Sequence, residues 1–204
     1  MNVLLIGPPG SGKGTQGERL SQRLGVEHLA AGDILRAEVA AGTELGQRAA
    51  EYLQRGALVP DSMVVDLMLP VTIAAAHRGG YLLDGFPRSV DQAIEARRLA
   101  EESDAAADVV VYLDAPTDVL IERLLRRAEI QGRSDDTLEV IEKRLHVFEM
   151  QTLPLIAYYE QRGLLIRFDA QASPEVITDE IAAAIDGVLR AAAERRATQA
   201  NKSR

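Results

Sequence analysis

A glycine-rich stretch near the N-terminus, GPPGSGKGTQ over residues 7–16, has the residue types and spacing of a phosphate-binding loop. Gly7, Gly12 and Lys13 supply the pattern G-x-x-x-x-G-K, in which glycines let backbone N–H groups converge on phosphate oxygens. A short apolar run precedes the loop and a helical pattern begins at Lys13, so the positive end of a helix would face the phosphates. These residues predict a site for the phosphates of a nucleotide, with Lys13 reaching the outer ones.

The position after the lysine departs from the general pattern. A serine or threonine there normally offers a hydroxyl to magnesium, but the residue is Gly14 and the first hydroxyl follows at Thr15. The stretch could be a chance glycine run, an ATPase without its metal ligand, or a site that handles magnesium differently. Asp84 ends an apolar run, where open parallel sheets place ligands, and a carboxylate there serves Mg²⁺ directly or through water.

Cationic residues in or beside loops give a second indication of phosphate chemistry. They are Lys13, Arg36, Arg88, Arg123, Arg127, Arg133 and Arg144. Arg123 and Arg127 are four positions apart and therefore share one helix face. The formal net charge is −8, from 23 Lys+Arg and 31 Asp+Glu. Converging cations in such a protein would repel one another unless a polyanion lay among them, and two nucleotides in one cleft would supply that charge.

The elements that must position these residues alternate between strand and helix. Apolar, β-branched runs predict strands at Val3–Ile6, Val26–Leu29, Tyr81–Leu83, Val109–Leu113 and Leu164–Phe168. Helical patterns cover Lys13–Leu24, Asp33–Ala41, Glu44–Arg55 and Asp61–His77, although Pro70 should kink or split the last. A capping box at residues 136–139 predicts a long helix to about Arg162, and Ser173-Pro174 opens the final helix. Alternating strands and helices predict an α/β fold with a parallel sheet.

Composition excludes several classes of protein. The acidic balance leaves no overall basic footprint for nucleic acid. The chain has no cysteine, which excludes disulfides and a thiolate zinc site. The N-terminal apolar run is too short for a signal peptide, and no apolar run approaches about 18 residues, the length that spans a membrane. We expect a soluble cytoplasmic protein, and we interpret His28, His77 and His146 as structural.

Six motifs in this order and at these intervals resemble adenylate kinase of the nucleoside monophosphate kinase family. Besides the loop they are HLAAGDILR, RGALVPDS, GGYLLDGFPRSVDQA, and the arginine-bearing pair RLLRRAEIQGRSDD and EVIEKRLHVF. The resemblance covers about residues 1–190 and is to the short-lid form without zinc. It implies a P-loop three-layer fold whose core comprises residues 1–30, 79–127 and 137–190. It also implies a helical nucleoside-monophosphate-binding insert at 31–78 and a short lid at 128–136, leaving a basic tail at 191–204 as a fraying helix end or a disordered segment.

The resemblance implies the reaction ATP + AMP ⇌ 2 ADP with Mg²⁺, catalysed without a general base. ATP would contact Gly7, Pro8, Gly10, Ser11, Gly12, Lys13, Gly14, Thr15, Arg123 and Arg127. AMP would contact Ala31, Arg36, Leu58, Val59, Gly85, Arg88, Gln92, Arg133 and Arg144. The catalytic cations would be Lys13, Arg88, Arg123, Arg127, Arg133 and Arg144. Asp33 and Asp84 would order waters on a magnesium ion that is held mainly by phosphates and water, and Thr15 would bond a phosphate.

One departure from the family pattern bears on the acceptor. Ala30-Ala31 stands where Ser-Thr is common, so a hydroxyl toward the acceptor nucleotide is lost, as in relatives that act on pyrimidine monophosphates. Gln92 favours adenine, because an amide can pair with two atoms of its edge. A CMP, UMP or broad acceptor range therefore stays open, as do an ATPase or switch protein with one nucleotide and an inert nucleotide-binding module. We expect a monomer.

Overall fold

The computed structural model describes residues 1–54, 59–131 and 137–202, and it confirms the predicted α/β fold around a five-stranded parallel sheet. The strand order is β2-β3-β1-β4-β5. The strands are β1 (Asn2–Ile6), β2 (Glu27–Ala30), β3 (Tyr81–Asp84), β4 (Val109–Asp114) and β5 (Leu165–Asp169). Each lies within one residue of its predicted place, and the apolar runs are clearest in β1, β3 and β4, which are covered on both faces along most of their length.

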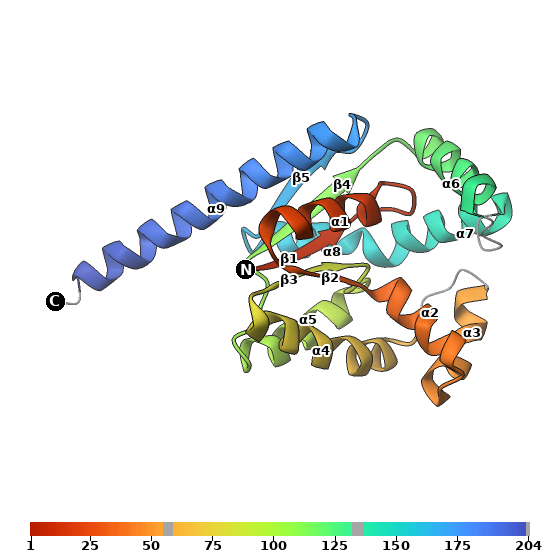
Figure 1. Cartoon of the computed structure of the whole chain (residues 1–204), viewed down its shortest axis with the longest axis horizontal. Coiled ribbons are helices and arrows are strands. Elements are labelled where there is room, and N and C mark those ends of the chain that lie inside the picture. The colour runs from red at the N-terminus through yellow and green to blue at the C-terminus, as the bar shows by residue number, and fades with distance from the viewer. Residues whose placement is uncertain (55–58, 132–136, 203–204) are drawn as a thin grey trace.

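Helices surround the sheet and make the three layers of the fold. They are α1 (Lys13–Leu24), α2 (Ala31–Ala41), α3 (Glu44–Gln54), α4 (Asp61–Arg78), α5 (Val90–Glu101), α6 (Thr117–Gln131), α7 (Leu138–Val147), α8 (Pro154–Glu160) and α9 (Pro174–Lys202). A π-helical turn, η1 (Phe148–Thr152), joins α7 to α8. Helices α1 and α9 lie on one side of the sheet, and α4 and α5 lie on the other (Figure 1).

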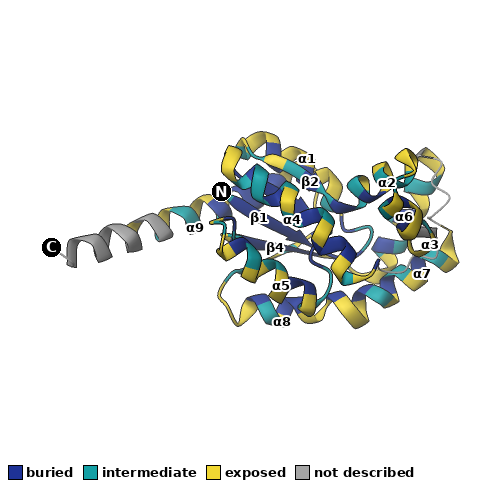
Figure 2. Cartoon of the chain, turned by 90° about the horizontal axis from the view of Figure 1, so that it is seen from below, coloured by how far each residue is buried: buried dark blue, intermediate teal, exposed yellow. Residues whose placement is uncertain are grey.

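Successive side chains of the central strand show how the two faces are filled. Val3 and Leu5 pack with Leu20 of α1 and Ile181 of α9, whereas Leu4 packs on the opposite face with helices α4, α5 and α8. This alternation is the two-residue period of a strand. Figure 2 shows the result, with buried strands β1 and β4 in the centre and exposed outer faces on the helices. No described helix is long and apolar enough to cross a membrane.

The predicted insert contains three helices, α2, α3 and α4, between β2 and β3. The sequence predicted that Pro70 would kink or split the helix. The predicted split is wrong, because α4 continues through Pro70 as one helix. Met68 and Ala75 are buried on either side of this point, while Pro70 itself is exposed. Burial of the surrounding turns therefore stabilises the helix against the local cost of a residue that has no N–H to donate.

The long helix predicted from residue 136 to about Arg162 is also wrong in part. Its first turn is capped by Thr137, whose hydroxyl accepts from the N–H of Val140, while Asp136, the predicted start of the capping box, lies outside the described residues. The π turn η1 then interrupts the helix. This turn places the buried Thr152 so that its hydroxyl donates to the carbonyl of Arg88, at 2.8 Å. At the other end of the chain, α9 remains helical through residues 191–202 of the basic tail.

Replacing Pro70 by alanine is expected to stabilise the protein. Proline costs about 3 kcal/mol more than alanine inside a helix, and the added freedom of the unfolded chain offsets up to about 1 kcal/mol, so a gain of roughly 2–3 kcal/mol should remain. The melting temperature measured by calorimetry should rise by roughly 4–12 °C. The control Ser62→Ala, at another exposed position of α4, should change it little. An unchanged or lower melting temperature in Pro70→Ala would show that α4 depends on the proline.

Candidate active site

A cleft of about 1030 Å³ opens at the carboxyl ends of the strands. It is bordered by the loop between β1 and α1, by the start of α2, by the loop after β3, by α6 and α7, and by the segment that leads from β5 into α9. This is the edge at which open parallel sheets bind ligands. Most of the residues that the sequence predicted for phosphate binding line this single cleft.

The glycine-rich loop has the backbone that a phosphate site requires. Gly10 and Gly12 have φ angles of +85° and +91°, which side chains rarely tolerate. A Cβ on Gly10 would also lie 2.7 Å from the carbonyl oxygen of Leu120. Helix α1 then begins at Lys13 with no side-chain cap and no acidic residue in its first turn. Its first N–H groups therefore have no anionic neighbour in that turn, which leaves them suited to an anion in the cleft.

Lys13 is held at the mouth of this loop. Its Nζ donates to the carbonyl oxygens of Gly7 at 2.8 Å and Pro8 at 3.0 Å. Burial lowers the pKa of Lys13 to about 8, against the opposing effect of Asp84, and Arg88, Arg144 and Arg127 lower it further. The ammonium is thus destabilised in the protein alone, and an added anion would stabilise it.

Ser11 lies against the floor of the loop. Its side chain is buried, and among the described residues none is within hydrogen-bonding distance of its Oγ. A Cβ on Gly7 would approach that oxygen to 2.6 Å, so the first glycine of the pattern makes room for the hydroxyl. A buried hydroxyl without a partner costs free energy, which a phosphate oxygen at the loop would recover.

Arg88 follows β3 and faces the cleft from the other side. Its Nε donates to the carbonyl of Gly85 at 2.7 Å. This bond fixes one edge of the guanidinium. Gly85 has a φ of +80°, and a Cβ there would lie 3.1 Å from Nη2 of Arg88. Burial lowers the pKa of Arg88, Asp84 raises it, and Arg144 and Arg36 lower it further. These cations therefore act on one another across the cleft.

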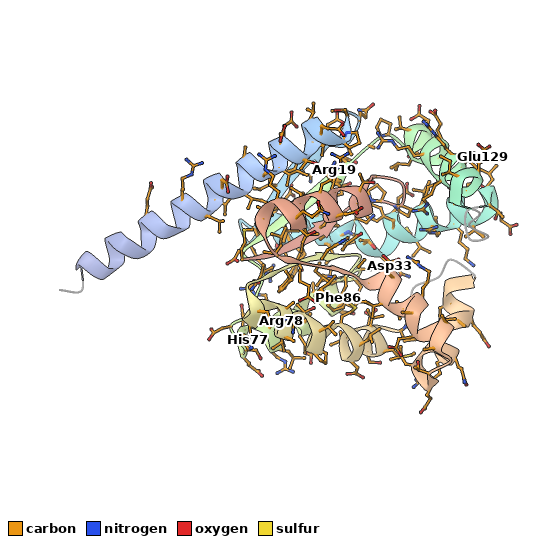
Figure 3. The ribbon with its side chains drawn as sticks, viewed as in Figure 1. Arg19, Asp33, His77, Arg78, Phe86 and Glu129 are labelled. Carbon is orange, nitrogen blue, oxygen red and sulfur yellow. The ribbon has the colours of Figure 1, made fainter. Side chains whose placement is uncertain are left out.

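Two carboxylates of the prediction lie among the cations. Asp84, at the end of β3, lines the cleft and is close enough to raise the pKa of Lys13. Asp33, labelled in Figure 3, is exposed at the start of α2. It forms an ion pair with Arg36. The same figure shows His77 and Arg78 at the far end of α4, away from Asp33. Among the described residues, no group of three or more metal-binding side chains gathers anywhere.

The described cleft carries an excess of positive charge. Arg123 and Arg127 of α6 and Arg144 of α7 complete a lining that also contains Lys13, Arg36 and Arg88. Three carboxylates, Glu18, Asp33 and Asp84, oppose these six cations. The described lining is therefore positive in a chain whose net charge is −8, which suits a polyanionic ligand.

Some predicted residues do not line the cleft. Leu58 and Arg133 lie outside the described residues. Val59 and Ala31 are buried, and Ala31 faces Gly85, because a Cβ on that glycine would lie 3.9 Å from the Cβ of Ala31. Gln92 is only 2% exposed, and both ends of its amide are bonded within the protein. Base binding by Gln92 and Val59 stays a prediction.

Sequence reasoning missed three residues near the site. Asp61 was interpreted only as the start of a helix, yet its carboxylate bonds to Ser89 and Gln92. Thr152 bonds to the carbonyl of Arg88 across 64 positions of sequence. His28 lines the cleft with a buried Nε2 that has no partner among the described residues. Pro60 before Asp61 was the one local signal, since it placed the aspartate at a helix N-terminus.

Comparison with known proteins agrees with this geometry. The family model described as adenylate kinase matches residues 5–164. The adenylate kinase of Kocuria rhizophila is 46% identical over 184 residues, which covers 90% of this chain and 98% of the relative. Those of a Synechococcus species and of Thermus thermophilus are 48% and 44% identical over 183 residues, 90% of this chain and 97% and 96% of the relatives. The chain belongs to the adenylate kinase family and is a nucleotide phosphotransferase.

Proposed function

We propose that the protein transfers the terminal phosphoryl group of ATP to AMP, reversibly, to give two ADP, with magnesium accompanying the nucleotides. The observation that carries this proposal is the convergence of six cations from different parts of the chain on one cleft. A single nucleotide at the glycine-rich loop gives no reason for Arg36 and Arg88, which approach from the opposite border. A second phosphate group at that border would account for both arginines.

The donor would lie along the loop, and the acceptor between α2 and the loop after β3. N–H groups at the start of α1, together with Lys13, would hold the donor's phosphates. Arg36 and Arg88 would hold the acceptor's phosphate, for which a guanidinium offers paired donors. Arg123, Arg127 and Arg144 border the space between and would neutralise the group in transfer.

This chemistry needs no general base. A nucleotide phosphate has a second pKa near 6, so its oxygen is already ionised near neutral pH and can attack without losing a proton. Catalysis then consists of aligning donor and acceptor, neutralising charge and excluding water. We propose that residues 128–136 close over the donor and deliver Arg133; of these residues, 128–131 form the end of α6 and the rest lie outside the described residues.

The residues present fit magnesium that arrives with the nucleotide. Gly14 offers no side-chain ligand, and nothing lies within 4 Å of where its Cβ would be, so the chain leaves open space at this position. Asp84 and Asp33 line the cleft and would hold waters of the metal ion. Magnesium would supply charge neutralisation at the phosphates, while the protein's cations orient them.

AMP is the proposed acceptor, and a pyrimidine monophosphate is the alternative. The alternative is favoured by one observation: Ala31, buried beside Gly85, brings no hydroxyl to the acceptor side of the cleft. Gln92 favours adenine, because its amide offers a donor and an acceptor to the base edge.

The first test supplies ATP and magnesium with AMP, CMP, UMP or no acceptor, and follows the products by chromatography. We expect rapid ADP formation with AMP and little without an acceptor. Rapid conversion of CMP or UMP in preference to AMP would establish the alternative. ADP formation that is slow and independent of acceptor would indicate a one-nucleotide ATPase, and no product would contradict the proposal altogether.

Arg88→Lys tests the acceptor clamp. Lysine keeps the charge but cannot both bond the carbonyl of Gly85 and present paired donors, so kcat/KM for AMP should fall by roughly 10- to 100-fold. The KM for ATP should change little. Arg97→Lys, which alters an exposed ion pair on α5, is the matched control and should keep full activity. An Arg88→Lys enzyme with near-normal kinetics would exclude the clamp.

Proton uptake tests the charge on Lys13. Because its pKa is about 8 in the protein alone, Lys13 is largely charged at pH 7 and partly neutral at about pH 8.5. Bound phosphates raise this pKa, so nucleotide binding at about pH 8.5 should take up part of a proton, and binding at pH 7 should take up little. Calorimetry in buffers of different ionisation enthalpy measures this. Lys13→Met should abolish the uptake and Lys143→Met should not; equal uptake in all three proteins would contradict the assignment.

A further inference from the structure

A partly buried hydrogen-bond network links the insert to the acceptor side of the core. The carboxylate of Asp61, at the first residue of α4, accepts from Oγ of Ser89 at 2.7 Å and from Nε2 of Gln92 at 2.7 Å. Ser89 caps helix α5, and Phe86, labelled in Figure 3, lies in the loop between β3 and this cap. Asp61 thus connects the start of α4 to the start of α5, through partners that lie 28 and 31 positions further along the chain.

The other end of the same amide is fixed by the backbone. The N–H of Arg88 donates to Oε1 of Gln92 at 2.6 Å. A carboxylate can only accept and a backbone N–H can only donate. Rotating the amide of Gln92 by 180° would set oxygen against carboxylate and N–H against N–H, and would leave buried polar groups without partners. The network therefore permits one orientation of this amide.

This orientation determines which base edge the amide can recognise. Nε2 has a second hydrogen and Oε1 a second lone pair, so the amide keeps one donor and one acceptor for a ligand. Their order is complementary to one arrangement of ring nitrogen and exocyclic group. Adenine offers an amino donor beside a ring acceptor, whereas a 6-oxopurine offers the reverse order. An amide free to rotate could serve both; an amide fixed in one sense serves one.

We propose that Asp61 is a positioning residue that makes the acceptor site select a 6-aminopurine over a 6-oxopurine. It acts through Gln92 and touches neither substrate. This inference rests on the proposed function, in which AMP is the acceptor and Gln92 contacts its base. Inosine monophosphate is the matched probe, because it differs from AMP only in the 6-oxo group and the accompanying ring proton.

The test compares kcat/KM for AMP and for inosine monophosphate in the wild type and in Asp61→Ala. Removing a charge-assisted hydrogen bond should lower the AMP/IMP ratio by about tenfold. Asp61→Asn should restore most of the ratio, because its amide oxygen can accept from Gln92 while its nitrogen donates to Ser89. Asp66→Ala, at an exposed carboxylate of the same helix, is the control and should keep the wild-type ratio.

A merely structural role for Asp61 would lower the rates with both acceptors equally and leave the ratio unchanged, which would overturn the proposal. A lower KM for AMP in Asp61→Ala with an unchanged ratio would overturn it too, because Asp61 would then compete with the base for Gln92. If Asp61→Ala does not fold, Asp61→Ser is measured in the same way. In a Gln92→Leu background, Asp61→Ala should not change the ratio further. Failure of the wild type to phosphorylate AMP would instead defeat the proposed function.

Discussion

The crowding of like charges at one edge of the sheet is the constraint on which the rest of the structure depends. Lys13 and Arg88 are placed where burial and neighbouring cations both lower their pKa, although Asp84 partly compensates. Such an arrangement costs stability in the protein alone. It is sustained by a well-packed sheet whose central strands, such as β1 and β4, are almost wholly buried, and it is relieved when anions enter the cleft.

The backbone at this edge of the sheet is also shaped by the binding of anions. Phosphate binding requires main-chain N–H groups to face the cleft, and this brings Gly10 and Gly12 to positive φ. On the acceptor side, Gly85 adopts a positive φ and lets the guanidinium of Arg88 lie against its carbonyl. At Gly10 and Gly85 glycine is needed for lack of space as well as for conformation, so each side of the cleft combines a tight turn with a cation.

Local sequence patterns predicted much of this arrangement. The residues that they missed are those whose partners lie far away in the sequence. The apolar runs located the strands, and the glycine spacing located the loop, because both are periodic or contiguous in sequence. Pro70 was expected to break a helix that tertiary packing keeps whole. Thr152 and Asp61 could not be assigned their roles, because their partners Arg88 and Gln92 lie 64 and 31 positions away. Such long-range contacts leave no periodic pattern in the sequence.

The cations of the cleft come from different parts of the chain, and this bears on how the enzyme would avoid hydrolysing ATP. The same charges that stabilise transfer to a phosphate would stabilise transfer to water, so they must not all act before an acceptor is present. Lys13 is fixed to its own loop, but Arg36 belongs to the insert, is 46% exposed and is paired with Asp33. Binding of an acceptor phosphate by Arg36 would therefore require this ion pair to rearrange. Because an exposed ion pair contributes little stability, an acceptor phosphate could take its place at low cost, and we infer that binding of the acceptor itself completes the cationic site.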